Sequence, residues 1–208
     1  MPGRATSIGA LGPSIHLVRH GEVINPGHLV YGDLPNFGLS ELGRRQAAAA
    51  ADHLSRRRIE RVVTSPLERA VSTAWTIGSR HGLVPEVDQR LSEWTLNREW
   101  LGRSWDDLPA HFPGQLEAYL ADPTTLDFAT ETIADMGSRV VEAIEHAWDT
   151  RTGRWEDVVV VFHQDPMETA RRMLTGRGFD HYRAAKPGHG DVISLAPRWR
   201  ETLWWRAS

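Results

Sequence analysis

The residues best suited to chemistry lie where an apolar run ends. Residues 15–18 are followed by Arg19, His20 and Gly21. This order is typical of a buried parallel strand in an open α/β sheet, which presents functional groups at its carboxyl end. The imidazole of His20 is a candidate nucleophile, and the planar donors of Arg19 suit a phosphate or a carboxylate. We expect Gly21 to allow a tight turn and a close approach of the backbone to a ligand.

A second histidine follows a second strand. His163 comes directly after residues 157–162, a continuous apolar run that is typical of a strand covered on both faces. A third strand is predicted for residues 61–65, and the helix after it carries Arg69. Because the carboxyl ends of parallel strands lie along one edge of a sheet, we expect His20, His163 and Arg69 to converge on one pocket.

This set of side chains favours chemistry at phosphorus. An imidazole can attack phosphorus, but the negative phosphoryl oxygens repel a nucleophile unless cations and donors surround them. Arg19 and Arg69 supply the positive charge. His163 adds a charge-assisted hydrogen bond, and the amide of Gln164, at the approach to a helix, is a further candidate donor.

The alcohol that leaves phosphorus needs a proton, which a protonated carboxyl group can supply. Glu93, beside Trp94, is our choice for this donor, and Glu99 and Asp106 are alternatives. Asn25 is a candidate contact to a phosphate oxygen or a substrate hydroxyl. The pair Asn25-Pro26 is equally a turn signal.

The elements that position these residues alternate along the chain. Strands are predicted at residues 15–19, 61–65, 157–162 and 192–195, and the tail 199–205 is expected to pair as an edge hairpin. Helices are predicted from residue 40 to 54, from 65 to 78, from 131 to 148 and from 166 to 174. The alternation predicts an α/β fold with a mostly parallel, doubly wound sheet. We expect one domain over residues 1–208, with about residues 94–128 forming a helical lid or cap insertion.

Composition narrows the possible partners. The chain has 208 residues, a formal net charge of −3 and no cysteine. We therefore expect neither nucleic-acid nor membrane-surface binding, and no thiolate metal site or cysteine nucleophile. No histidine shows metal-ligand spacing, and no stretch reaches the length of a membrane span. The default expectation is a soluble, cytoplasmic protein whose oligomeric state the sequence does not give.

Four blocks of the chain, in order, resemble the histidine phosphatase superfamily, also called phosphoglycerate mutase-like. They are Arg-His-Gly-Glu at 19–22, Thr-Ser-Pro-Leu-Glu-Arg-Ala at 64–70 with Thr-Ala at 73–74, Leu-Ser-Glu at 91–93, and Val-Val-Phe-His at 160–163. The resemblance implies a three-layer α/β/α sandwich that needs no metal or other cofactor. It also implies that His20 becomes phosphorylated, that Arg19, Arg69 and His163 form the phosphate pocket, and that Glu93 donates the proton.

The chain departs from the family pattern at two places. Many members carry a glycine after the second histidine, where Gln164-Asp165-Pro166 stands here. Members with mutase activity usually have Thr or Ser and then Trp-Asn shortly after the first motif, where residues 23–26 read Val-Ile-Asn-Pro. We therefore expect the phosphatase branch, a phosphomonoesterase acting on a small phosphorylated substrate. A phosphoglycerate mutase-type phosphoryl transferase and a weakly catalytic module that binds a phosphorylated ligand are the alternatives.

Overall fold

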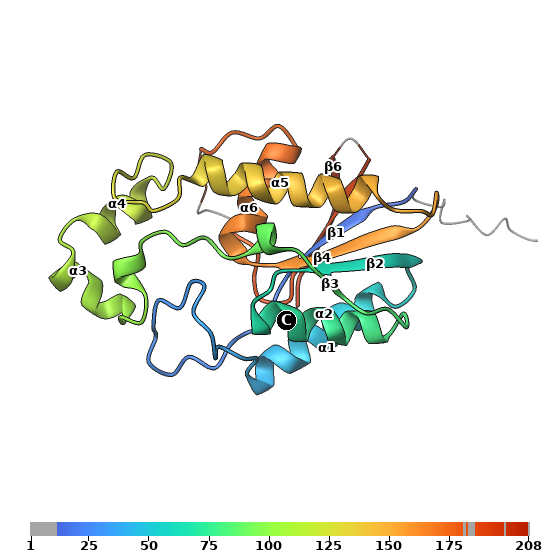
Figure 1. Cartoon of the computed structure of the whole chain (residues 1–208), viewed down its shortest axis with the longest axis horizontal. Coiled ribbons are helices and arrows are strands. Elements are labelled where there is room, and N and C mark those ends of the chain that lie inside the picture. Colours follow the sequence, from blue (N-terminus) through green and yellow to red (C-terminus); the bar gives the residue numbers. More distant parts are fainter. Residues whose placement is uncertain (1–11, 181, 183–185, 198, 208) are drawn as a thin grey trace, which may run out of the picture.

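Six strands form one mixed sheet in the order β3-β2-β4-β1-β5-β6 (Figure 1). The computed structural model describes residues 12–180, 182, 186–197 and 199–207. The strands β1 to β4 pair in parallel, whereas β5 runs antiparallel to β1 and forms a hairpin with β6. The bounds are Ile15–Arg19, Ile59–Thr64, Glu86–Val87, Asp157–Phe162, Val192–Ala196 and Arg200–Trp205 for β1 to β6.

Helices cover both faces of this sheet. Figure 1 shows α1 (Glu41–Leu54) and α2 (Glu68–Ser79) below it, and α5 (Ile133–Asp149) and α6 (Gln164–Leu174) above it. The central strand β4 serves both layers, because successive side chains of a strand point to opposite faces. Its Val159 and Val161 belong to the α1 and α2 core, and Val158 and Val160 to the core under α5. The predicted three-layer, mostly parallel sandwich is confirmed.

The segment between β3 and α5 contains short helical pieces, most of them within the stretch of about residues 94–128 for which helical structure was predicted. Three 3-10 turns, Gln89–Leu91, Arg98–Trp100 and Trp105–Asp107, lead into α3 (Leu108–His111) and α4 (Gln115–Ala121). Figure 1 shows α3 and α4 beyond the end of the sheet. Trp100 of the second 3-10 turn and Tyr119 of α4 are buried in the same apolar cluster as Met136 of α5. This continuity fixes the segment to the sheet.

Some helix ends differ from the sequence prediction. Helix α2 begins at Glu68, not at Ser65-Pro66, because Leu67 is extended and its N–H donates to Ser65 Oγ at 3.3 Å. Helix α6 begins at Gln164, two residues before Pro166. Residues 1–11 lie outside the part of the chain that the structure describes. Within those described, none of the helices is long and apolar enough to cross a membrane.

The glycine after His20 serves helix packing. A Cβ on Gly21 would lie 2.2 Å from the carbonyl oxygen of Gly43, and a Cβ on Gly43 would lie 2.0 Å from that of Glu22. The backbone after β1 therefore passes directly against the first turn of α1. The structure gives Gly21 this contact between two backbone segments, and its expected close approach to a ligand stays a prediction.

Replacement of Gly43 by alanine tests the contact. Alanine in a helix is normally favoured over glycine by about 1 kcal/mol, but forcing a methyl group onto packed backbone typically costs about 1–3 kcal/mol or more. We expect Gly43→Ala to lower the free energy of unfolding, measured by urea denaturation, by at least about 1 kcal/mol. Gly12→Ala is the control, since its Cβ would meet nothing within 4 Å. An unchanged or higher urea midpoint for Gly43→Ala would contradict the packing argument.

Candidate active site

Two histidines lie side by side because of the register between β1 and β4. Arg19 of β1 is opposite Phe162 of β4, so His20 and His163 follow the strands at the same level. The N–H of His20 donates to the carbonyl of Phe162 at 3.0 Å. Both side chains are buried, and their ring centroids are 5.1 Å apart. The predicted convergence of the strand ends is found.

The protonation of His20 follows from its hydrogen bonds. Its Nδ1 is 2.6 Å from the carbonyl oxygen of Gly21, which can only accept, so Nδ1 carries the proton. The lone pair of the neutral ring is therefore on Nε2, which accepts from Arg69 Nε at 3.2 Å. Burial and then the charge of Arg69 hold the pKa of His20 well below its usual 6.5. The ring is a neutral base with its free nitrogen facing a guanidinium.

Arg69 reaches this nitrogen from the first turn of α2. Its Nη2 donates to the carbonyl of Gly32 at 2.6 Å, and its guanidinium carbon lies 4.8 Å from the ring centroid of Tyr31. These contacts hold a fully buried charge in one orientation. Thr73, one turn later, accepts from the N–H of Gly21 at 3.2 Å and ties α2 to the residue after the histidine.

Arg19 is held by the loop that precedes β5. Its Nη1 donates to the carbonyl of Pro187 at 2.9 Å, and its Nη2 donates to Nε2 of His189 at 2.8 Å. Among the described residues, Arg19 Nε has no hydrogen-bond partner. Burial, with the charges of Arg19 and Arg69, lowers the pKa of His189 to about 3, and its ring centroid lies 5.5 Å from that of His20. His189 is therefore a neutral member of the same site.

His163 offers its other nitrogen to the pocket. Its Nε2 lies 2.7 Å from Ser65 Oγ, and that oxygen already accepts from the backbone N–H of Leu67. The direction of this hydrogen bond depends on the tautomer of His163: when the hydroxyl of Ser65 donates to Nε2, the ring proton lies on Nδ1. Nδ1 has no hydrogen-bond partner in the part of the chain described, and it lies 3.9 Å from Glu93 Oε2. In the tautomer with its proton on Nδ1, His163 is a donor toward the pocket.

Glu93 has an unusual environment for a carboxyl group. Burial and, secondly, the charge of Asp165 raise its pKa to about 7, although Arg69, Arg19 and the N–H of Trp94 oppose the shift. Its Oε1 accepts that N–H at 2.8 Å. The alternative donor Asp106 is mostly exposed and lies 3.5 Å from His28. Glu99 does not line the cavity described below.

The backbone around Glu93 is fixed by a cation that was not among the predicted site residues. Arg139 of α5 donates through Nη1 to the carbonyls of Arg90 and Ser92, at 2.6 and 2.9 Å. The same guanidinium binds both carboxylate oxygens of Glu131, at 2.5 and 2.8 Å. In the sequence, Arg139 resembles any charged residue on the polar face of a helix, so no pattern marks it as part of the site.

The three predicted substrate contacts have different surroundings. The N–H of Gly21 is already donated to Thr73. Asn25 binds the backbone of Leu29 through both ends of its amide, at 2.9 and 3.0 Å, which favours the turn interpretation. Gln164 lies beside Arg19 and donates through Nε2 to the carbonyl of Pro187 at 2.9 Å. Their roles as substrate contacts stay predictions.

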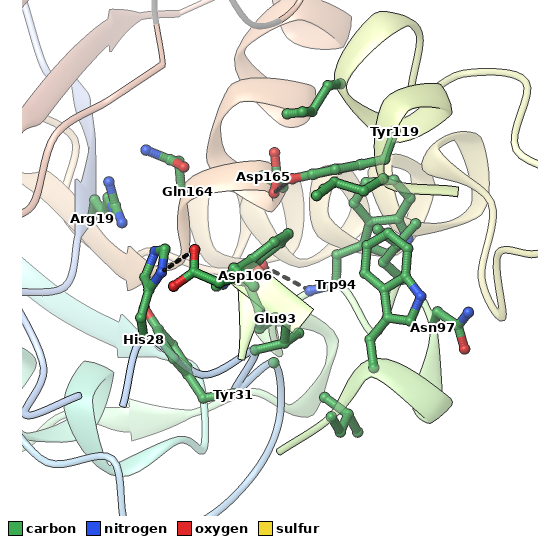
Figure 2. A pocket seen from close by; sticks show the side chains of 18 residues that line it. Arg19, His28, Tyr31, Glu93, Trp94, Asn97, Asp106, Tyr119, Gln164 and Asp165 are labelled. Atoms are coloured by element: carbon green, nitrogen blue, oxygen red, sulfur yellow. Dashed lines mark hydrogen bonds and ion pairs between the residues drawn. The ribbon is translucent and has the colours of Figure 1, made fainter. Parts of the chain in front are cut away.

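A cavity of about 440 Å³ opens next to these groups. Figure 2 shows Arg19 and Gln164 at one end, Glu93 near the middle, and Trp94 and Asn97 at the other end. Its volume is in the range of sites for small molecules. The described residues contain no group of three or more His, Asp or Glu side chains placed to hold a metal ion. At the end of the cavity that holds Gln164, the positive charge comes from the guanidinium group of Arg19.

Comparison with known proteins assigns the chain to a family. Residues 15–202 match the sequence model of the histidine phosphatase superfamily (branch 1). A glucosyl-3-phosphoglycerate phosphatase of Mycobacterium tuberculosis is 37% identical over 154 residues, which cover 71% of this chain and 68% of that protein. Phosphoserine phosphatase 1 of Hydrogenobacter thermophilus is 31% identical over 163 residues, or 77% of this chain and 75% of that protein.

Solved structures agree with the sequence match. The complex of a mycobacterial glucosyl-3-phosphoglycerate phosphatase with VO3 superposes with a TM-score of 0.82 at 31% identity, over 94% of this chain and all of that one. These relatives are phosphatases, and the sequence-based resemblance is confirmed. The chain belongs to branch 1 of the histidine phosphatase superfamily.

Proposed function

We propose that this protein is a phosphomonoesterase that works through a phosphohistidine on His20. The observation that carries the proposal is the fixed tautomer of His20, whose proton is held on Nδ1 by Gly21 while the lone pair on Nε2 faces Arg69. A neutral imidazole with a free nitrogen is the form that attacks phosphorus. The phosphatase relatives support the reaction class.

In the first step, Nε2 of His20 forms a bond to phosphorus as the ester P–O bond breaks. Arg69 turns its Nε–H from the histidine lone pair to a phosphoryl oxygen. Arg19 and the Nδ1–H of His163 donate to the other oxygens, which stabilises the charge of the transition state without a metal ion. Glu93, protonated, gives its proton to the departing alcohol oxygen.

In the second step, the two catalytic groups exchange roles. Ionised Glu93 takes a proton from a water molecule, whose oxygen attacks phosphorus as the P–N bond breaks. Inorganic phosphate leaves, and His20 regains its lone pair while Glu93 regains its proton. A pKa of about 7 suits both roles of Glu93, because its protonated and its ionised forms are both well populated at neutral pH.

Removal of the nucleophile tests the central assignment. We expect His20→Ala to reduce phosphate release from phosphomonoesters by roughly 10⁴-fold or more, because the described site contains no other unpaired imidazole lone pair facing Arg69. His146→Ala, on the exposed face of α5, is the control and should keep full activity.

A second experiment traps the intermediate. When the reaction with a phosphate-labelled substrate is quenched at neutral or alkaline pH, the label should stay on the wild-type chain and not on His20→Ala. Near-full activity of His20→Ala would remove the assignment, and isomerisation of 3-phosphoglycerate without phosphate release would favour the mutase alternative.

The role of Glu93 is tested by changing the leaving group. An alkyl alcohol needs a proton as it departs, whereas p-nitrophenol leaves readily as an anion. We expect Glu93→Gln to lower kcat/KM by roughly 10²–10⁴-fold for an alkyl phosphate and much less for p-nitrophenyl phosphate. Asp106→Asn should affect neither value strongly. Equal losses on the two substrates would show that Glu93 does not act as the acid.

The pH dependence follows from two shifted pKa values. His20, whose pKa is lowered, stays neutral at and above pH 6.5, so kcat/KM should not fall there through its protonation. Glu93 loses its proton as the pH rises through about 7, and kcat/KM should decline above that pH. Asp165→Asn removes a negative charge that helps to raise the pKa of Glu93. The pKa of Glu93 should therefore fall in this variant, and the decline in kcat/KM should begin at a lower pH. A shift to higher pH would contradict the assignment.

A further inference from the structure

The cavity beside Glu93 has walls made largely of aromatic rings. It contains Tyr31, Trp94, Trp100, Trp105 and Tyr119, together with several aliphatic side chains. It shares Arg19, Glu93 and Gln164 with the phosphate pocket, so an alcohol that accepts a proton from Glu93 departs into this space. Figure 2 shows Tyr119 reaching from the side away from Arg19 toward Asp165.

The rings support one another in a fixed arrangement. Trp105 stacks on Tyr119 with centroids 6.1 Å apart and an interplanar angle of 27°. Trp100 is nearly perpendicular to both rings, at 6.1 Å from each. Offset-stacked and edge-to-face pairs are the favoured geometries of aromatic side chains. The walls are therefore preorganised before a ligand arrives.

Several polar groups of these walls are already used within the protein. The indole N–H of Trp94 donates to the carbonyl of Glu131 at 2.8 Å, and that of Trp100 donates to Gln115 Oε1 at 3.0 Å. The side-chain oxygen of Asn97 accepts from the N–H of Glu99, and its amide nitrogen donates to Gln115 Oε1. The rings thus present mainly carbon surface to a ligand, which suits an apolar ring better than a sugar with many hydroxyls.

The charges around the cavity are unfavourable for an anion beyond the phosphate. Of the described lining residues, Arg19 belongs to the phosphate pocket, and His28 lies against Asp106 at the exposed mouth. Asp106 and Asp165 place two carboxyl groups in the lining of the cavity. The ammonium of Lys186 binds Asp165 but does not line the cavity. A carboxylate on the alcohol would meet like charge, which is destabilising.

We propose that this cavity binds the alcohol part of the substrate and selects a flat, uncharged ring system over a sugar acid. The proposal rests on the proposed phosphomonoesterase activity and specifies its substrate class. It separates this chain from relatives named for glucosyl-3-phosphoglycerate, a compound with both a sugar and a carboxylate.

The first test compares two alkyl phosphates whose leaving alcohols have similar acidity, 2-phenylethyl phosphate and 3-phosphoglycerate. We expect kcat/KM for the aromatic ester to be higher by about tenfold or more. Trp105→Ala should reduce that ratio severalfold, and Trp155→Ala, at an exposed tryptophan that does not line the cavity, should leave it unchanged. An equal or higher kcat/KM for 3-phosphoglycerate would overturn the proposal.

A charge change tests the same idea without removing a ring. Asp106→Arg, at a mostly exposed side chain that lines the cavity, should raise kcat/KM for 3-phosphoglycerate severalfold. Asp107→Arg is the matched control, because this exposed neighbour does not line the cavity. Equal effects of the two variants would show that the charge of the cavity does not select the substrate.

Binding of non-hydrolysable phosphonates separates this inference from the reaction. Calorimetry should give tighter binding of 2-phenylethylphosphonate than of 3-phosphonopropionate to the wild-type protein. If neither ester is hydrolysed, the proposed function fails, but this order of affinities still decides the selectivity of the cavity. Equal affinities, or tighter binding of the carboxylate compound, would overturn the proposal even if both esters are hydrolysed.

Discussion

The candidate site depends on the parallel register of β1 and β4. The pairing of Arg19 with Phe162 sets His20 and His163 at one level, and the bond from the His20 N–H to Phe162 continues the ladder to the histidine itself. A shift of one residue would turn one imidazole to the other face of the sheet. The distance between His20 and His163, the proposed nucleophile and donor, is therefore set by backbone hydrogen bonds, and the two rings need little further support from flexible side chains.

The same buried environment moves the ionisation of the two proposed catalytic groups in opposite directions. Removal from water disfavours the charged form of any group, so the pKa of His20 falls and that of Glu93 rises. The guanidinium groups lower the pKa of the imidazole further, while Asp165 raises that of the carboxyl group. A neutral base and a protonated acid can then coexist near neutral pH, which is the combination that the first step needs.

The sequence was sufficient to predict which side chains meet at the strand ends. It was not sufficient to predict which loops and helices pack against them. His20, His163 and Arg69 were expected together because parallel strands end at one edge, and this holds. His189 was not assigned because the direction of β5 is not visible in its apolar pattern. An antiparallel strand begins at the edge where its parallel neighbours end, so the loop before β5 meets Arg19. Position 21 likewise requires a glycine because its backbone packs against the backbone of Gly43. The sequence around Gly21 does not reveal this contact.

The departure from the family pattern after His163 connects the phosphate pocket with the aromatic cavity. Gln164 donates to the same Pro187 carbonyl as Arg19 and so helps to hold the loop that carries His189. Asp165 faces the cavity, accepts from the hydroxyl of Tyr119 at 3.3 Å, and raises the pKa of Glu93. A leaving group beside Asp165 changes the field that this carboxylate exerts on the proposed proton donor. Asp165 therefore links the proposed selection of the alcohol with the pKa of the proposed proton donor.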